Sequence, residues 1–436
     1  MKTFIKDLLS ITISKLIIII FGLAGGIVTA RRLGPEANGV IATLNVYPSL
    51  FMTFGALGIS QSATHFIGKD KYPESSIKNS IAQIWIFSTI ICLLFSFFLI
   101  RHFVSFGSNI LWAILAISPI PFQLFITYNS GIFLGKNRIS TYNKINWIPS
   151  FVNFCLTIIL LCVFQLGING ALIAAISGPL VMFFLLLFRN DFIKSFSLRF
   201  DWEIIYSLLS LGIVYAISLL VINLNYKADI IMLDKMSTSY VTGIYSKGVS
   251  IVNYLWQIPM MLSTIVFARS AHAKDEKSFS IKVAQLLRVS IIIEGLCSII
   301  LIFTAKYIIL FLYGEEYFDS IKVLQILLPG VLILTIFKVL NMDLAGKGKP
   351  WVSMKAMLPA LIINIIMNYL FIPKYGANGA ALASTISYSL AAIVFLVLYS
   401  KEVKFSIHDI FRYSKADLEV IKGIIIVLRG KKNEEI

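Results

Sequence analysis

The sequence predicts an all-α integral membrane protein with about twelve transmembrane helices in two six-helix lobes related by a parallel pseudo-twofold repeat. Three observations support this: an apolar composition, a regular series of long apolar segments, and short motifs that recur in the second half. Of the 436 residues, 58% are hydrophobic and 14% are charged, against about 25% charged in a typical soluble domain. A mean hydropathy of +0.85 excludes a water-soluble globule. The continuous apolar runs also exclude a membrane β-barrel, whose strands alternate polar and apolar residues.

The net charge of +16 would suggest a nucleic-acid partner in a soluble protein. Here no nucleic acid is expected, because the cytoplasmic loops of membrane proteins collect Lys and Arg. No phosphate-binding loop is present, so hydrolysis of ATP by this chain is not expected. The cysteines lie inside apolar runs, which indicates small core residues instead of a disulfide framework or a metal site. They are Cys92, Cys155, Cys162 and Cys297.

Twelve apolar segments are long enough to cross a bilayer, which requires roughly 20 residues each. The first segment is not predicted to be a cleaved signal peptide, because Lys15 precedes its apolar run and Arg31 and Arg32 follow it. The expected spans are residues 10–30, 40–66, 81–100, 110–134, 145–165, 168–188, 204–226, 240–267, 286–305, 321–344, 354–372 and 378–400.

The basic residues between these spans predict the orientation of the chain. With a cytoplasmic N-terminus, 27 Lys and Arg residues fall on the inner side and 8 on the outer side. Because basic residues favour the cytoplasmic side, both termini are expected in the cytoplasm. The protein itself is expected in the bacterial inner membrane.

An internal duplication links the two halves. Gly167-Ile-Asn-Gly-Ala recurs as Gly376-Ala-Asn-Gly-Ala at an offset of 209, and Gly39 matches Gly243 at an offset of 204. Pro149 and Pro359 match at an offset of 210, and Gly135-Lys136 and Gly346-Lys347 match at 211. The predicted lobes are residues 1–200 and 201–400, followed by a basic cytoplasmic tail at 401–436. A parallel repeat of this kind places a cavity between the lobes.

Ionisable residues inside spans are costly unless they meet water or a partner, so they mark candidate sites. The predicted cationic cavity residues, which would bind an anionic head group, are Lys15, Arg31, Arg32, Lys247 and Lys338. The candidates for ion coupling or charge pairing are Asp229, Asp234 and Glu294.

Each assignment has a structural alternative. Lys15, Arg31 and Arg32 could instead extend to the lipid head groups. Asp229 could only neutralise Lys227, which is near it in sequence, although the two do not share a helix face. Asp343 lies near a span end and is expected at the surface. Glycines in the first span, Gly22, Gly25 and Gly26, would suit a helix that lines a cavity.

The segment Ala30-Arg-Arg-Leu-Gly-Pro-Glu-Ala-Asn-Gly39 resembles the signature of the polysaccharide transporter family, which includes the O-antigen flippases of the Wzx type. The repeated Gly-x-Asn-Gly-Ala motif is similar too, and the resemblance covers about residues 1–415. It implies the fold of the multidrug/oligosaccharidyl-lipid/polysaccharide (MOP) exporter superfamily. It also implies a substrate, an undecaprenyl-pyrophosphate-linked oligosaccharide moved from the cytoplasmic to the periplasmic leaflet, with H+ or Na+ coupling and no cofactor. Membrane lipids, a polysaccharide polymerase and chain-length machinery would be its partners.

Two other functions remain open at this stage. A cation-coupled drug or metabolite exporter of the same superfamily would suit the acidic residues Asp229, Asp234 and Glu294. A membrane-embedded polymerase or ligase would need a large external loop that carries catalytic groups, and the external segments here are short.

Overall fold

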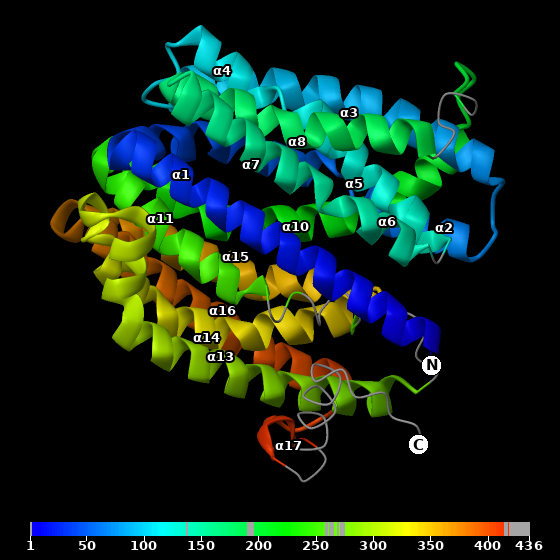
Figure 1. Ribbon diagram of the computed structural model, residues 1–436. Helices are drawn as coiled ribbons and strands as arrows, with labels where there is room; N and C mark the ends of the chain where they lie inside the picture. Colours follow the sequence, from blue (N-terminus) through cyan, green and yellow to red (C-terminus); the bar gives the residue numbers. More distant parts are fainter. Residues whose placement is uncertain are drawn as a thin grey trace.

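The protein is described by a computed structural model that covers residues 2–136, 138–189, 196–257, 260, 266–267, 270, 275–413 and 417. The chain is helical throughout this described part (Figure 1). Most of the predicted tail, 401–436, lies outside the described residues. Within the described residues, ten helical segments are long and apolar enough to cross a membrane.

The first of these segments, Ser14–Gly68, is long enough for two crossings. Its main helix, α1 (Lys2–Gly55), bends at Gly34, where φ is 71° and Pro35 follows. Glycine adopts this positive φ at little energetic cost. The bend at Gly34, with Pro35 after it, breaks the helical hydrogen bonding. Leu57 and Gly58, with φ of 47° and 61°, then separate α1 from α2 (Ile59–Gly68). The predicted second span, 40–66, is therefore interrupted.

The rest of the first half contains four more crossings. Two of them are composite, because Pro119 separates α4 from α5, and α6 is followed by α7 and a π-helical turn η1. The elements are α3 (Glu74–Phe103), α4 (Ile110–Ile117), α5 (Ile120–Gly135), α6 (Ile139–Asn146), α7 (Ile148–Ile158), η1 (Ile159–Val163) and α8 (Gly167–Arg189).

The second half repeats this plan with longer helices. Its elements are α10 (Trp202–Met236), α11 (Ser239–Leu255), α13 (Glu276–Tyr313), the 3-10 turn η2 (Glu315–Tyr317), α14 (Ser320–Gly346), α15 (Trp351–Tyr375), α16 (Ala377–Val403) and α17 (Ile407–Phe411). The spans expected at 204–226 and 286–305 were too short, because α10 and α13 continue past them. The two crossings of α1–α2 and the 17-residue helix α11 complete the twelve-helix fold.

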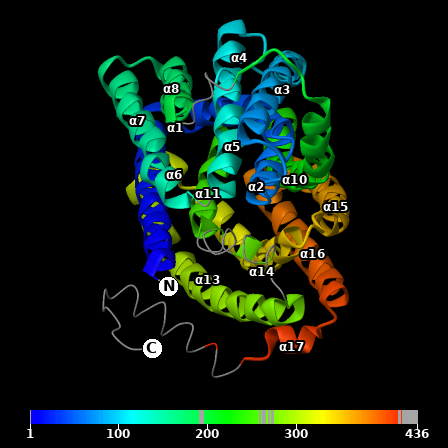
Figure 2. The same cartoon turned by 90° about the vertical axis from the view of Figure 1, so that its right-hand side faces the viewer.

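Helices of the two halves form two groups with separate cores (Figure 2). The larger core belongs to the second half, between α10, α11 and α13–α16. Helix α10 contacts both groups, because it packs on α15 and α16 and also on α2 and α3. The starts of α1 and α13 lie at one end of the bundle, here called the terminal end, and the bend of α1 lies at the opposite end, here called the bend end (Figure 1).

Candidate functional site

A cavity of about 370 Å³ lies between the two halves. Helices α1, α7 and α8 line it from the first half, and α10 and α11 line it from the second. The position agrees with the cavity that a parallel repeat predicts between its lobes. Its lining residues are Gly22, Gly25, Gly26, Thr29, Asn38, Ile41, Ala42, Asn45, Asn153, Thr157, Ala171, Ala175, Lys227, Ile230, Ser246, Lys247, Val249, Ser250 and Asn253.

The charge of this cavity is cationic. Lys227 of α10 and Lys247 of α11 line it, and the described lining contains no acidic side chain. The ammonium of Lys247 lies 3.4 Å from the carbonyl oxygen of Gly26, to which it donates, and 5.6 Å from the centre of the Tyr313 ring. An anion that entered this cavity would meet two positive charges.

Neutral polar groups and glycines make up much of the remaining wall. Amide and hydroxyl side chains come from both halves, and they can bond to many hydroxyl groups in varied orientations. Gly25 and Gly26 face open space, because a Cβ built on either would meet nothing within 4 Å. Larger residues at these positions would therefore project into free volume at the α1 wall.

The cavity lies next to a tight contact between the halves at the bend end. A Cβ on Gly39 would lie 1.9 Å from the carbonyl oxygen of Ser239, and one on Gly243 would lie 1.8 Å from that of Pro35. The start of the second crossing and the start of α11 thus touch backbone to backbone. Gly39 and Gly243 are the glycines that the sequence repeat pairs, so the contact joins equivalent points of the two halves.

Polar bonds reinforce this contact, and they use residues predicted for substrate or ion binding. Arg31 donates to the carbonyl oxygens of Phe311 and Leu312 at the C-terminus of α13, at 2.5 and 3.0 Å, where a cation is favoured by the helix dipole. Asp234 accepts a bond of 3.1 Å from the backbone N–H of Ser105. The structure therefore places Arg31 and Asp234 in ties between the halves, outside the cavity lining.

The other predicted cationic residues of α1 also lie outside the cavity lining. Arg32 is exposed at the bend end, beside Arg31. Lys15 is partly buried and lies between the start of α1 and its bend at Gly34, toward the terminal end. Their proposed contact with substrate remains a prediction.

Asp229 is at the centre of a polar cluster inside the second half. Its carboxylate is completely buried and accepts hydrogen bonds from Tyr245 and Ser384, both at 2.5 Å, and from Asn364 at 3.0 Å and Asn368 at 2.7 Å. Four helices, α10, α11, α15 and α16, contribute to it. The alternative in which Asp229 only neutralises Lys227 is wrong, because the two side chains leave α10 toward different surroundings.

Glu294 and Lys338 occupy a second buried site in the same half. Glu294 accepts a hydrogen bond from Thr335 and interacts electrostatically with Lys338. The Lys338 ammonium lies 3.9 Å from the centre of the Trp256 ring and 4.8 Å from that of Tyr226, which are cation–π distances. Lys338 therefore lies beside aromatic rings of α10 and α11, and it does not belong to the cavity lining.

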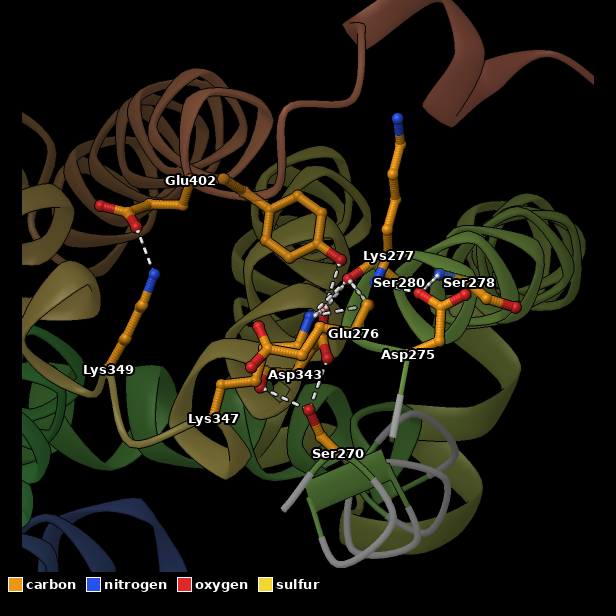
Figure 3. A network of polar contacts seen from close by, with 11 residues as sticks. Ser270, Asp275, Glu276, Lys277, Ser278, Ser280, Asp343, Lys347, Lys349 and Glu402 are labelled. Atoms are coloured by element: carbon orange, nitrogen blue, oxygen red, sulfur yellow. Dashed lines mark hydrogen bonds and ion pairs between the residues drawn. The ribbon is translucent and has the colours of Figure 1, made fainter. Parts of the chain in front are cut away.

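Asp343 was expected at the surface, and this was wrong. Its side chain is fully buried at the terminal end and bonds to Ser270 at 2.6 Å and Ser280 at 2.7 Å, and to Lys347 at 3.0 Å (Figure 3). The start of α13 and residue 270 cover the end of α14, so closeness to a helix end did not mean exposure. Tyr399 of α16 also donates to this carboxylate at 2.7 Å.

Comparisons with protein families and with known proteins identify the family of this chain. Residues 4–270 match the family model described as polysaccharide biosynthesis protein, and residues 215–370 match the MatE family. The first match covers more than half of the sequence. The chain belongs to the polysaccharide biosynthesis protein family. The capsular polysaccharide biosynthesis protein CapF of Staphylococcus aureus is 31% identical over 185 residues, which cover 41% of this chain and 46% of that protein.

Solved structures of other membrane proteins share the fold of this chain. The lipid II flippase MurJ in an inward closed conformation has a TM-score of 0.74 at 18% identity, over 97% of this chain and 93% of that one. An inward-facing multidrug resistance transporter of the MATE family has a TM-score of 0.72 at 17% identity, over 88% and 94%. The protein is thus a multi-pass membrane protein with the fold of these MOP-superfamily structures, the fold that the resemblance at Ala30–Gly39 implied.

The sequence did not lead us to all the residues of this site. Lys227 was noted as an intramembrane charge, but not as a cavity residue. Asn364 and Asn368 were not considered, although two amides four residues apart in an apolar helix share one face and are a readable signal. The role of each lysine and carboxylate in transport remains a prediction.

Proposed function

We propose that this protein is a flippase for an undecaprenyl-pyrophosphate-linked oligosaccharide, such as an O-antigen or capsule repeat unit. It would act in the bacterial inner membrane, with both termini cytoplasmic, and deliver the head group to the periplasmic leaflet. The observation that carries the proposal is the cavity between the halves, with Lys227 and Lys247 and no acidic side chain in its described lining. Membership of the polysaccharide biosynthesis family supports the same substrate class.

The lining suits both parts of such a head group. A pyrophosphate is a strong acceptor for ammonium groups, and charged hydrogen bonds of this kind are about twice as strong as neutral ones. The amides of Asn38, Asn45, Asn153 and Asn253 could then bond to sugar hydroxyls. The lipid tail would stay in the bilayer, so only the polar group would need the cavity.

Alternating access follows from the contact at the bend end. In the structure, Gly39 and Gly243 hold the halves together beside the cavity. With the bend end on the periplasmic side, as the basic residues predict, this arrangement is closed to the periplasm. Release of the head group requires the Gly39–Gly243 contact and the Arg31 and Asp234 ties to separate.

Ion coupling is proposed at the Asp229 cluster. A fully buried carboxylate held only by neutral donors lacks a compensating charge, and a proton or Na+ would supply it. Two oxygen ligands for Na+ lie in the cluster, the Asp229 carboxylate and the Ser384 hydroxyl. The amides of Asn364 and Asn368, which now donate to Asp229, would turn their oxygens toward a bound ion. The amide oxygen of Asn368 is buried without a hydrogen-bond partner in the described structure. Neutral oxygens with one carboxylate suit a hard monovalent cation.

The test uses a deletion strain that carries the tagged gene. We expect Lys247→Gln to lower surface polysaccharide at least tenfold by immunoblot, with lipid-linked repeat units retained in the cytoplasmic leaflet and the protein level unchanged. Lys247→Arg should keep most of the activity, and Lys235→Gln, an exposed lysine on the neighbouring helix, is the matched control. Normal surface polysaccharide in Lys247→Gln would refute the cationic cavity as the substrate site.

A second candidate is a cation-coupled exporter of drugs or metabolites. The MatE match at residues 215–370 favours it, whereas the lack of a carboxylate in the described cavity lining disfavours a cationic substrate. A deletion strain that becomes sensitive to cationic drugs but keeps normal surface polysaccharide would support the exporter.

A further inference from the structure

Helices α10 and α11 carry matched pairs of residues between the cavity and the Asp229 cluster. On α10, Lys227 lines the cavity and Asp229 lies in the buried cluster two residues later. On α11, Lys247 lines the cavity, and Tyr245, two residues earlier, donates to Asp229. Residues two apart in an α-helix are separated by about 200°, so each helix presents one member to either side.

The bond between Tyr245 and Asp229 links the two helices at this level. The phenol donates to the carboxylate at 2.5 Å, and both residues are almost completely buried, at 1% and 0% exposure. A short, charge-assisted bond in a dry interior is among the stronger hydrogen bonds. It therefore fixes the rotation and height of α10 against α11, and with them the positions of Lys227 and Lys247.

The two lysines are the cations that this link positions. Both are largely buried, both line the same cavity, and within the described residues neither forms a salt bridge with a carboxylate. Among the described residues, the contacts of the Lys247 ammonium are the 3.4 Å hydrogen bond to the backbone carbonyl of Gly26 and the ring of Tyr313. Two such ammonium groups repel each other until an anion joins them, so their spacing determines how well a diphosphate fits.

We propose that Lys227 and Lys247 form one two-lysine site for phosphate groups, and that the Asp229–Tyr245 hydrogen bond sets its spacing. Tyr245 is then a positioning residue, and α10 and α11 carry the coupling between the ion site and the substrate site. Neutralisation of Asp229 by a proton or Na+ weakens its bond to Tyr245 and alters the lysine spacing. By linkage, an anion between the lysines changes cation affinity at Asp229 by the same factor. This inference rests on the proposed flippase function.

The first experiment measures binding of inorganic pyrophosphate to the purified full-length protein in nanodiscs by calorimetry at constant ionic strength. Wild type should bind saturably, and Lys227→Gln and Lys247→Gln should each weaken binding about tenfold, the usual cost of one charged hydrogen bond. Lys235→Gln serves as the control and should bind like wild type. If Lys247→Gln weakened binding while Lys227→Gln kept the wild-type affinity, the anion site would not include Lys227, and the two-lysine arrangement would be overturned. No saturable binding to wild type at millimolar pyrophosphate would overturn the site as a whole.

The second experiment is a double-mutant cycle with the same probe. Asp229→Asn mimics the neutralised carboxylate, whether a proton or Na+ neutralises it in the wild-type protein. Tyr245→Phe removes only the hydroxyl. We expect Asp229→Asn to change pyrophosphate affinity at least threefold, and this change to disappear in the Tyr245→Phe background. A purely structural role would lower the melting temperature and leave the two effects additive. Additive effects, or no effect of Asp229→Asn, would overturn the positioning role.

Failure of this inference can be distinguished from failure of the flippase. If Lys247→Gln abolishes surface polysaccharide while the cycle is additive, the transport function stands and the coupling route is wrong. Tyr240→Phe, at the start of α11 with its hydroxyl 3.4 Å from the carbonyl oxygen of Glu316, is the matched tyrosine control and should change neither measurement.

Discussion

The two halves share a helical plan but differ in what they bury. Among the described residues, the first half buries amides and hydroxyls such as Asn129 and Gln83, with Lys78 as its one buried acidic or basic side chain. The second half buries more acidic and basic side chains. These are Asp229, Lys247, Arg288, Glu294, Asp343 and Asp417.

This difference shows which half does the electrostatic work. Each ionisable group in a membrane helix carries a cost of at least ~2.5 kcal/mol on insertion scales unless water or a partner compensates it. The second half meets that cost with networks from several helices, as around Asp229. The first half supplies a neutral polar wall to the same cavity. Under the proposed function, the second half would hold the coupling ion and the first half would be the movable wall.

The sharpest test of the comparison uses two lysines that the repeat pairs, Lys136 and Lys347. Lys136 bonds to Glu74 at 2.5 Å, with the two side chains 25% and 36% exposed. Lys347 bonds to Asp343 at 3.0 Å, with exposures of 4% and 0%. The same position in each half therefore holds a half-exposed ion pair and a buried one.

We expect Lys347→Met to lower the free energy of unfolding by about 3 kcal/mol, because it leaves a buried carboxylate without its cation. Lys136→Met should cost less than about 1 kcal/mol, as for solvent-exposed pairs. Thermal unfolding of both variants in the same detergent measures the difference. Lys349→Met, which breaks the exposed pair with Glu402 (Figure 3), is a control within the second half and should behave like Lys136→Met. Equal losses for Lys136 and Lys347 would mean that burial does not distinguish the halves.

The second prediction concerns the Glu294–Lys338 site. Glu294→Gln leaves Lys338 without its acidic neighbour, and Lys338→Met leaves Glu294 without its basic one. The double variant should recover about 1–3 kcal/mol relative to the sum of the single losses, as coupled neighbours do. Thermal unfolding of the four proteins provides the measurement. A strictly additive double variant would show that these residues do not act as a pair and would return Glu294 to the list of independent ion sites.

The third prediction addresses the contact that joins the halves. Gly243→Val places side-chain atoms where a Cβ alone would be 1.8 Å from the Pro35 carbonyl oxygen, so the bend end should open more often. In a cysteine-free background with Ser250→Cys in the cavity, labelling by a membrane-impermeant thiol reagent added on the side of the bend end should rise about tenfold. That rise corresponds to about 1.4 kcal/mol in the opening equilibrium.

The control for this experiment is Gly295→Val on α13, where the nearest atom to an added Cβ is 3.9 Å away. Its labelling rate should equal that of the parent protein. Equal rates in Gly243→Val and the parent would argue that the Gly39–Gly243 contact does not limit access from this end.

The sequence was a good guide to the fold and a partial guide to the site. The structure places Lys247 in the cavity lining, and the sequence pointed to it because it lies far from either end of its span; its role in substrate binding stays a prediction. Arg31 lies outside the cavity lining, because the bend at Gly34 brings α1 to the end of α13, a contact between residues 280 and 281 positions apart in sequence. Lys338 was assigned to the cavity, but α14 is apolar on all sides, so periodicity could not indicate which face looks inward.

The smallest expected effect concerns the neutral wall of the first half. Asn153 lines the cavity from α7 and donates to the Ala174 carbonyl oxygen at 3.0 Å. Asn153→Ala should weaken pyrophosphate binding less than about threefold, because a neutral hydrogen bond contributes about 0.5–1.5 kcal/mol and is already satisfied within the protein. Lys247→Gln, measured alongside, should weaken it about tenfold. If Asn153→Ala matched Lys247→Gln, the first half would hold the phosphate groups as firmly as the second, and the division between a charged half and a neutral wall would not hold.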